Sequence, residues 1–182
     1  GKYDIIRTLK VDKAKDLLYF IASPNNATER YLYRIGLNGK GLKRLSPADQ
    51  TGSHSYNISP DAKWALHTFS NIELPPVTNL IELYSHKVIR VMEKNQGLQD
   101  KLEKLKRPKA EFFRINIDNG VSVDAYAILP PDLNPNKKYP LLVYVYGEPA
   151  GQTTVNSWRG SGGLWHWMLA QQGYVVMSID NR

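Results

Sequence analysis

Short apolar runs alternate with polar turn residues along the first half of the chain, up to about Asn95. This close spacing of strand and turn signals favours an all-β sandwich or propeller over alternating strands and helices. The expected strands form two sets of four, over residues 5–11, 17–22, 31–37 and 42–45, and then over residues 55–58, 63–69, 79–84 and 87–92. Two four-stranded units of roughly 40 residues each match the period of propeller blades.

The hydrophobic pattern changes after Asn95. Three leucines recur at the i, i+4 and i+7 positions of a helix and predict a short amphipathic connector over residues 96–109. These leucines are Leu98, Leu102 and Leu105. Asp100 and Lys104 have the spacing of an exposed ion pair on the same helix. Pro108 ends the helical segment, because proline disfavours helix at the residue before it.

An antiparallel hairpin is expected after the connector. Residues 111–117 and 121–129 both alternate apolar and polar positions, and the Asp-Asn-Gly sequence at 118–120 is a turn signal. The apolar side of the first strand is expected to carry Phe113, Ile115 and Ile117. Two prolines at 130–131 end the second strand.

The last third of the chain has the pattern of a strand, a loop, a helix and a second strand. Residues 141–146 form a continuous apolar run of the kind found in strands that are buried on both faces of a sheet. Helical spacing over residues 162–172 ends at Gly173, and residues 174–179 form another apolar run. This order predicts a right-handed crossover between parallel strands. The predicted fold class is therefore mixed β and α/β.

Composition limits the classes of protein to which the chain can belong. Its 182 residues are 42% hydrophobic and 23% charged, a balance that supports a globular core. The net charge of +7 is spread along the chain among acidic residues, so we expect no nucleic-acid partner. Because the chain has no cysteine, disulfides, thiolate nucleophiles and Cys-ligated metals are excluded. The longest apolar runs fall far short of the roughly 18 residues of a membrane span, and the first residues contain no signal-peptide core.

The histidines do not have the spacing of a metal site. His67 lies in an expected strand and is interpreted as a core or sheet-face residue, whereas His54 precedes a strand and His86 occupies a turn. His166 stands between two tryptophans and is expected at the surface, while the tryptophans cover the sheet. No His-Glu-x-x-His motif is present, and we expect neither a metal nor another cofactor.

Two further features are weighed and assigned no chemistry. Gly160-Ser161-Gly162 brings its glycines too close together for the Gly-x-Ser-x-Gly motif of a nucleophilic serine. Asp180 and Arg182 are expected to form an ion pair where the last strand ends.

Several segments carry a resemblance to a known family. Residues 139–149, Tyr-Pro-Leu-Leu-Val-Tyr-Val-Tyr-Gly-Glu-Pro, resemble the strand and loop near the start of the hydrolase domain in the prolyl oligopeptidase family, most closely in its dipeptidyl peptidase IV branch. Residues 173–182 resemble the next hydrolase strand. The segments that look like the last part of the branch's β-propeller are residues 30–33, 38–46, 52–55, 58–61 and 87–90. The resemblance is collinear over nearly the whole chain.

This resemblance implies a domain organisation and an activity. It implies C-terminal blades of a β-propeller over residues 1–95, the helical connector over 96–109, and the first strands of a truncated α/β-hydrolase (peptidase) domain over 110–182. The implied activity is that of a serine exopeptidase that releases N-terminal dipeptides by acyl transfer from peptides with proline or alanine at the second position. The resemblance also favours an exported protein and a homodimeric parent.

The implied catalytic triad is not found in this chain. The family's nucleophile lies in a Gly-x-Ser-x-Gly elbow that is followed by Asp and His, and the chain contains no such elbow. We therefore expect a piece that ends before the nucleophile and is inactive on its own. Tyr146 is the one catalytic group that matches: in the family, this tyrosine's hydroxyl donates a hydrogen bond to the oxyanion of the tetrahedral intermediate. A neutral phenol, with a pKa of about 10, suits that role.

The residues alone leave two alternatives open, one for the role of Tyr146 and one for the function of the chain. Without the resemblance, Tyr146 is interpreted as a core aromatic with a solvated hydroxyl. The chain can also be a non-catalytic, β-propeller-type interaction module with a degenerate hydrolase half. A peptidase needs the elbow, Asp and His beyond Arg182, whereas such a module does not. In either case two blades without a ring and a truncated sheet expose strand edges, so we expect the fragment to self-associate.

Overall fold

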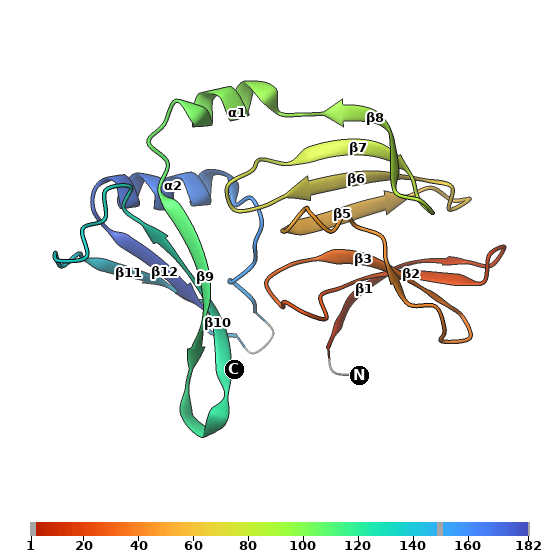
Figure 1. The fold of residues 1–182 in the computed structure, drawn as a ribbon, viewed down its shortest axis with the longest axis horizontal. Coiled ribbons are helices and arrows are strands. Elements are labelled where there is room, and N and C mark those ends of the chain that lie inside the picture. The colour runs from red at the N-terminus through yellow and green to blue at the C-terminus, as the bar shows by residue number, and fades with distance from the viewer. Residues whose placement is uncertain (1–2, 149–150, 182) are drawn as a thin grey trace.

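The computed structural model describes residues 3–148 and 151–181, which form three four-stranded sheets, two α-helices and one 3-10 turn (Figure 1). The first sheet contains β1 (Ile5–Asp12), β2 (Leu17–Ala22), β3 (Tyr31–Gly36) and β4 (Lys43–Arg44). The second contains β5 (Ser53–Ile58), β6 (Trp64–Ser70), β7 (Val77–Glu82) and β8 (Lys87–Glu93). The third contains β9 (Lys109–Asn116), β10 (Ser122–Leu129), β11 (Leu141–Tyr144) and β12 (Val175–Ile179). The helices are α1 (Gln96–Glu103) and α2 (Gly160–Gln171), and the 3-10 turn covers Asp118–Gly120.

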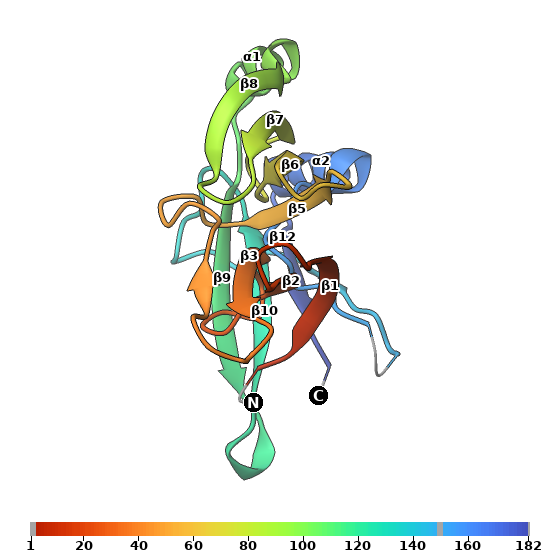
Figure 2. The ribbon, with the colours of Figure 1, turned by 90° about the vertical axis from the view of Figure 1, so that its right-hand side faces the viewer.

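The first and second sheets confirm the two predicted antiparallel units. In each sheet the strands pair antiparallel with their neighbours in chain order. Figures 1 and 2 show the two sheets stacked one above the other, with β3 and β5 next to each other. β4 is shorter than the expected strand. Beyond its end the Leu45 N–H still donates to the Leu32 carbonyl at 2.8 Å, and the Leu45 side chain is buried in the core.

A shared hydrophobic core joins these two sheets. Tyr19 and Leu32 from the first sheet meet Ile81 and Leu83 from the second, and all four side chains are fully buried. Burying one side chain of this size stabilises a fold by roughly 1.5–3 kcal/mol. The face-to-face packing of two four-stranded sheets is the arrangement expected of neighbouring propeller blades.

The predicted connector helix is present as α1. Leu102 is buried in a core that α1 shares with the third sheet and α2. Leu105 lies beyond the helix end and is exposed. The ion pair predicted between Asp100 and Lys104 is absent from the salt bridges of the described residues. The helix ends at Glu103, and the Asp100 carboxylate accepts a 2.8 Å hydrogen bond from the Gln96 amide instead.

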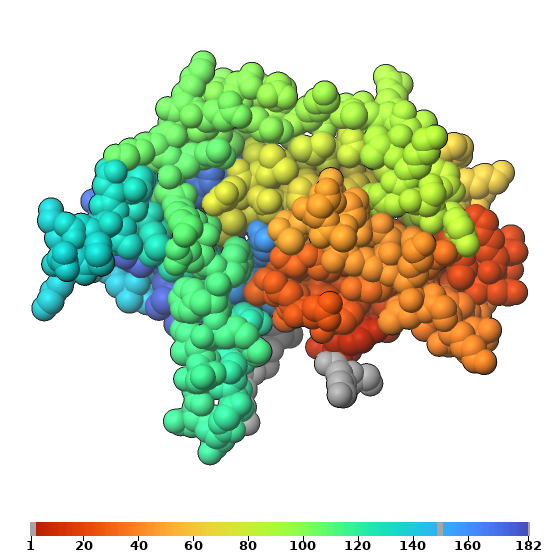
Figure 3. Space-filling model, viewed as in Figure 1, coloured from red at the N-terminus to blue at the C-terminus, as the bar shows by residue number. Residues whose placement is uncertain are grey.

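The third sheet is mixed, with the spatial order β11-β12-β10-β9. β9 and β10 form the predicted antiparallel hairpin, whose tip extends beyond the rest of the molecule (Figure 3). Asn119 and Gly120 in the turn adopt φ values of 62° and 72°, which suit these residue types. The predicted apolar side of this strand is wrong at Phe113 and at Ile117, which lies just beyond the end of β9; both side chains are exposed. Phe112 faces the core, with its ring centroid 5.7 Å from that of Tyr126.

β11 and β12 form the predicted parallel pair, with α2 in the connection between them. The expectation that residues 141–146 are buried on both faces is wrong. β11 ends at Tyr144, and Leu141 and Val143 are exposed. β11 is an edge strand of the third sheet, and Leu142 is the one side chain of β11 that packs on the core beneath α2.

α2 covers one face of the third sheet, within two residues of the predicted helix bounds. Trp167 and Ala170 pack against Tyr126 and Val176 in a second core. Ile72, from the loop between β6 and β7, joins the same core, so the second and third sheets are in contact.

His166 is not at the surface, which corrects the sequence-based expectation. Its side chain is 6% exposed, and its ring lies 5.7 Å from Tyr144 and 5.4 Å from Trp165. Its position on α2 turns His166 toward the end of β11, where its ring packs against that of Tyr144. The two tryptophans beside His166 differ in burial. Trp167 is buried on the sheet as expected, whereas Trp165 is exposed.

Candidate functional site

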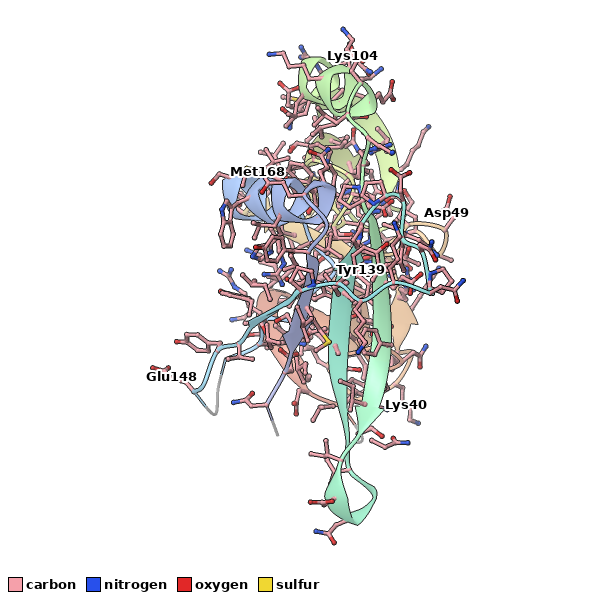
Figure 4. All side chains as sticks on the ribbon, turned by 90° about the vertical axis from the view of Figure 1, so that its left-hand side faces the viewer. Lys40, Asp49, Lys104, Tyr139, Glu148 and Met168 are labelled. Atoms are coloured by element: carbon pink, nitrogen blue, oxygen red, sulfur yellow. The ribbon has the colours of Figure 1, made fainter. Side chains whose placement is uncertain are left out.

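The candidate site lies where the chain leaves β11. Tyr146 is two residues beyond the strand end, and its side chain is 45% exposed. Glu148 stands at the outer tip of the loop that follows (Figure 4). In sheets with parallel strands, ligands bind outside the carboxyl ends of those strands, and Tyr146 is at that end of β11.

The Tyr146 hydroxyl is an exposed hydrogen-bond donor at this edge. It donates a hydrogen bond of 3.0 Å to the Glu148 carboxylate, and both residues are exposed. Its ring lies directly against Gly151, where an added Cβ would clash with the Tyr146 ring. A phenol that already donates to a carboxylate can donate in the same way to another negatively charged oxygen.

Side chains of the β12 end hold the backbone on both sides of Tyr146. The Ser178 hydroxyl donates a 2.7 Å hydrogen bond to the Tyr144 carbonyl. The Asn181 amide donates a 2.5 Å hydrogen bond to the Glu148 carbonyl. Both bonds cross from one strand end of the parallel pair to the other, so they fix the start and the tip of the loop.

Asp180 has a role that the sequence did not reveal. Its Oδ1 accepts the backbone N–H groups of Thr153 and Thr154 at 2.7 and 2.8 Å, and the Thr153 hydroxyl at 3.1 Å. A carboxylate oxygen that accepts several N–H groups pins a loop firmly. Its predicted partner, Arg182, lies outside the described residues.

The second sheet contains a cluster of buried polar groups that the sequence analysis did not predict. His54, His67 and His86 gather around Tyr56, with the His54 and His67 rings stacked 5.1 Å apart. His54 Nδ1 lies 2.9 Å from His67 Nε2, and His54 Nε2 lies 3.0 Å from the Gln50 carbonyl. The strand register offers the signal that could have found it, because the pairing of β5 with β6 sets Tyr56 opposite His67.

The hydrogen bonds of this cluster assign its tautomers. The Gln50 carbonyl can only accept, so a neutral His54 carries its proton on Nε2 and accepts at Nδ1. His67 then donates from Nε2, and its buried Nδ1 has no partner. Burial lowers the pKa of His54 to about 4 and that of His67 to about 3. The cluster is therefore uncharged at neutral pH.

The described part of the chain contains neither a metal-ligand cluster nor a membrane-spanning helix. Within residues 3–148 and 151–181, no three His, Cys, Asp or Glu side chains are arranged to hold a metal ion. None of the helices described there combines the length and apolar character needed to cross a membrane.

Fold and site together describe a mostly β protein, with two antiparallel four-stranded sheets consistent with propeller blades and an exposed phenol beyond a parallel strand. Comparison with known proteins agrees with this class. Residues 1–76 match the family model described as "Dipeptidyl peptidase IV (DPP IV) N-terminal region". The whole chain aligns with the crystal structure of Porphyromonas gingivalis dipeptidyl peptidase 4 at a TM-score of 0.89 and 25% identity, covering 25% of that chain.

Curated relatives point to the same family. "Probable dipeptidyl-aminopeptidase B" of Emericella nidulans is 31% identical over the full chain, which covers 20% of that protein. Dipeptidyl peptidase 4 of Trichophyton rubrum is 28% identical over the full chain, which covers 24% of it. The chain is thus related to dipeptidyl peptidase IV, as its sequence motifs indicated, and it spans about a fifth to a quarter of the length of these relatives.

Proposed function

We propose that the chain is part of a serine-type dipeptidyl peptidase. In this proposal residues 1–95 form blades of its β-propeller and residues 110–182 begin an α/β-hydrolase domain. Residues 96–109 form the helical connector between the two. The mixed sheet supports the assignment, since parallel strands joined through a covering helix are the building unit of α/β folds. The names of the relatives, which align over the whole chain, support the peptidase class.

Tyr146 is the proposed oxyanion donor. The observation that carries this role is the exposed phenol at the carboxyl end of β11, already engaged as a donor to a carboxylate. In the complete enzyme a serine attacks the scissile carbonyl, a histidine takes its proton and an aspartate orients the histidine. The developing negative charge on the carbonyl oxygen then accepts the Tyr146 O–H together with a backbone N–H.

The proposed substrates are peptides with proline or alanine at the second position, from which N-terminal dipeptides are released. The reaction needs only side-chain and backbone groups, so it uses no cofactor. The triad serine, aspartate and histidine would come from outside these 182 residues, and the fragment alone would not hydrolyse peptides.

A non-catalytic interaction module is the second candidate function. The two candidates differ in what the full-length coding sequence must contain. In the full-length coding sequence a peptidase requires that elbow with a later Asp and His, and a degenerate module does not.

The replacement Tyr146→Phe tests the peptidase proposal in the full-length protein. Removal of one oxyanion donor is expected to lower kcat by roughly 100- to 1,000-fold, because the bond forms only as charge develops. Steady-state hydrolysis of an Xaa-Pro dipeptidyl substrate measures the change, and circular dichroism checks that the fold is kept. Unchanged turnover would remove Tyr146 from the mechanism.

A further inference from the structure

The segment that links the Tyr146 loop to α2 is bound to all three sheets. Residues 152–158, which we call the strap, run between the first two sheets and the third (Figure 1). The strap has no helix or strand of its own, yet Thr153 and Thr154 within it are buried. The backbone N–H groups of Thr153, Thr154 and Asn156 donate to partners far away in the sequence.

Asn156 makes the contacts of the strap with the first two sheets. Its backbone N–H donates to the Thr28 carbonyl at 2.7 Å, and its own carbonyl accepts the Ser53 hydroxyl at 2.9 Å. Its side-chain Oδ1 accepts the backbone N–H of Ile72 at 3.0 Å. One residue thus bonds to the loop before β3, the start of β5 and the loop after β6.

Further contacts support Asn156 at both ends of the strap. The Gln152 amide donates to the Ala27 carbonyl at 2.9 Å and accepts the Arg30 guanidinium. The Trp158 N–H donates to the Ser70 hydroxyl at 3.3 Å. The strap is therefore fastened to the first sheet near its beginning and to the second sheet near its end.

The strap also contacts the third sheet, at the carboxyl ends of β11 and β12. Asp180 accepts the N–H groups of Thr153 and Thr154, and the Thr153 hydroxyl lies 2.7 Å from that of Ser178. Ser178 in turn bonds the Tyr144 carbonyl, and Asn181 bonds the Glu148 carbonyl. These two carbonyls flank Tyr146 on either side.

We propose that Asn156 is a positioning residue that ties the Tyr146 loop to the two blade sheets, so that the propeller portion sets the location of the oxyanion donor. This inference rests on the proposed function. Asn156 does not touch the reacting atoms, and it acts through the strap, Asp180 and Ser178. A shift of about 1 Å in a group that contacts the transition state can cost on the order of 100-fold in rate, so a lost anchor has a measurable effect.

The test compares variants of the full-length enzyme. We expect Asn156→Ala to lower kcat by roughly tenfold or more with KM changed by less than about twofold, because donor placement matters in the transition state and not in substrate binding. Asn156→Asp keeps an acceptor for the Ile72 N–H and is expected to restore most of kcat. Asn38→Ala is the matched control: its Oδ1 also accepts a backbone N–H, that of Lys40 at 3.0 Å, but inside a remote turn.

Tyr146→Phe, measured in parallel, separates the two claims. If Tyr146→Phe lowers kcat and Asn156→Ala does not, the positioning role is overturned while the proposed function stands. If Asn156→Ala lowers kcat equally in the presence and absence of the phenol, the residue does not act through Tyr146 and the inference is again overturned. The expected result is that Asn156→Ala changes kcat by less than about twofold in the Tyr146→Phe background. An unchanged kcat for Tyr146→Phe overturns the proposed function itself.

Discussion

Three histidines of the second sheet are buried in a form that cannot easily accept a proton. His54 and His67 already share one hydrogen bond, and the His86 Nε2 lies 2.9 Å from the Tyr56 hydroxyl. Burial is the largest cause of the lowered pKa of each histidine, and Arg44 adds a repulsive positive charge at His54. Protonation of one ring would place a charge beside its neighbours without a counter-ion.

Stability of the chain should therefore fall on mild acidification. Unfolded histidines titrate near pH 6.5, whereas folded His54 and His67 have pKa values of about 4 and 3. Because the unfolded chain binds protons that the folded chain does not, stability is complete above about pH 6.5 and is lost as the pH falls toward these folded values. His54 and His67 each contribute a loss that approaches roughly 1 kcal/mol per pH unit below about pH 6.

Urea unfolding of the chain between pH 7.5 and 5.5 measures this dependence above the range in which most carboxylates titrate. His67→Gln keeps an N–H donor for His54 but cannot be protonated, so its free energy of unfolding should fall less steeply with pH. Parallel slopes for the two proteins would show that the cluster does not set the acid sensitivity.

At the scale of single elements, α2 stabilises the third sheet through one side of its surface. Trp167 is 3% exposed and packs edge-to-face on Trp158 with ring centroids 5.9 Å apart. Trp165, two residues earlier on the same helix, is 49% exposed. The helix therefore contains two tryptophans with the same chemistry and opposite burial.

Trp167→Ala is expected to destabilise the chain by about 3–5 kcal/mol, the usual cost of truncating a buried tryptophan. Trp165→Ala in the same helix should cost less than about 1 kcal/mol. Chemical denaturation followed by far-ultraviolet circular dichroism compares the two. Equal losses of stability would mean that α2 is seated on the sheet by another face.

At the scale of the whole molecule, features set by local sequence were predicted and features set by neighbours were not. The eight strands of the first two sheets and the β9–β10 hairpin follow from alternation and turn residues, which act over a few positions. The exposure of β11 and the burial of His166 depend on what lies beside them in space. The anchoring of Asn156 joins residues 84 to 128 positions apart, and no short motif encodes it.

The candidate site was predicted only through family resemblance. The position of Tyr146 after an apolar run can be seen in the sequence, but the run alone does not distinguish a rim from a core position. Asp180 accepts the backbone N–H groups of the strap, a role that the sequence analysis did not predict. Backbone partners carry no residue-type signal, so such a role is not visible before folding.

The outer strand of the second sheet predicts self-association of the isolated chain. Every residue of β8 is exposed, including Val88, Ile89, Val91 and Met92. Open strand edges with apolar side chains pair readily with other chains. Sedimentation velocity at micromolar concentration is expected to detect dimers or larger species, and Val91→Lys should reduce them. A monodisperse monomer for the unchanged chain would contradict the prediction.

The role of Tyr146 is tested most directly by a crystal structure of the full-length enzyme with a peptide boronic acid that carries proline next to boron. Such a compound forms a tetrahedral adduct with a nucleophilic serine and mimics the oxyanion. We expect one boronate oxygen to lie about 2.6–3.2 Å from the Tyr146 hydroxyl, with the phenol turned from Glu148 toward it. An adduct whose oxygens are all bound by other donors, with Tyr146 still on Glu148, would contradict the account.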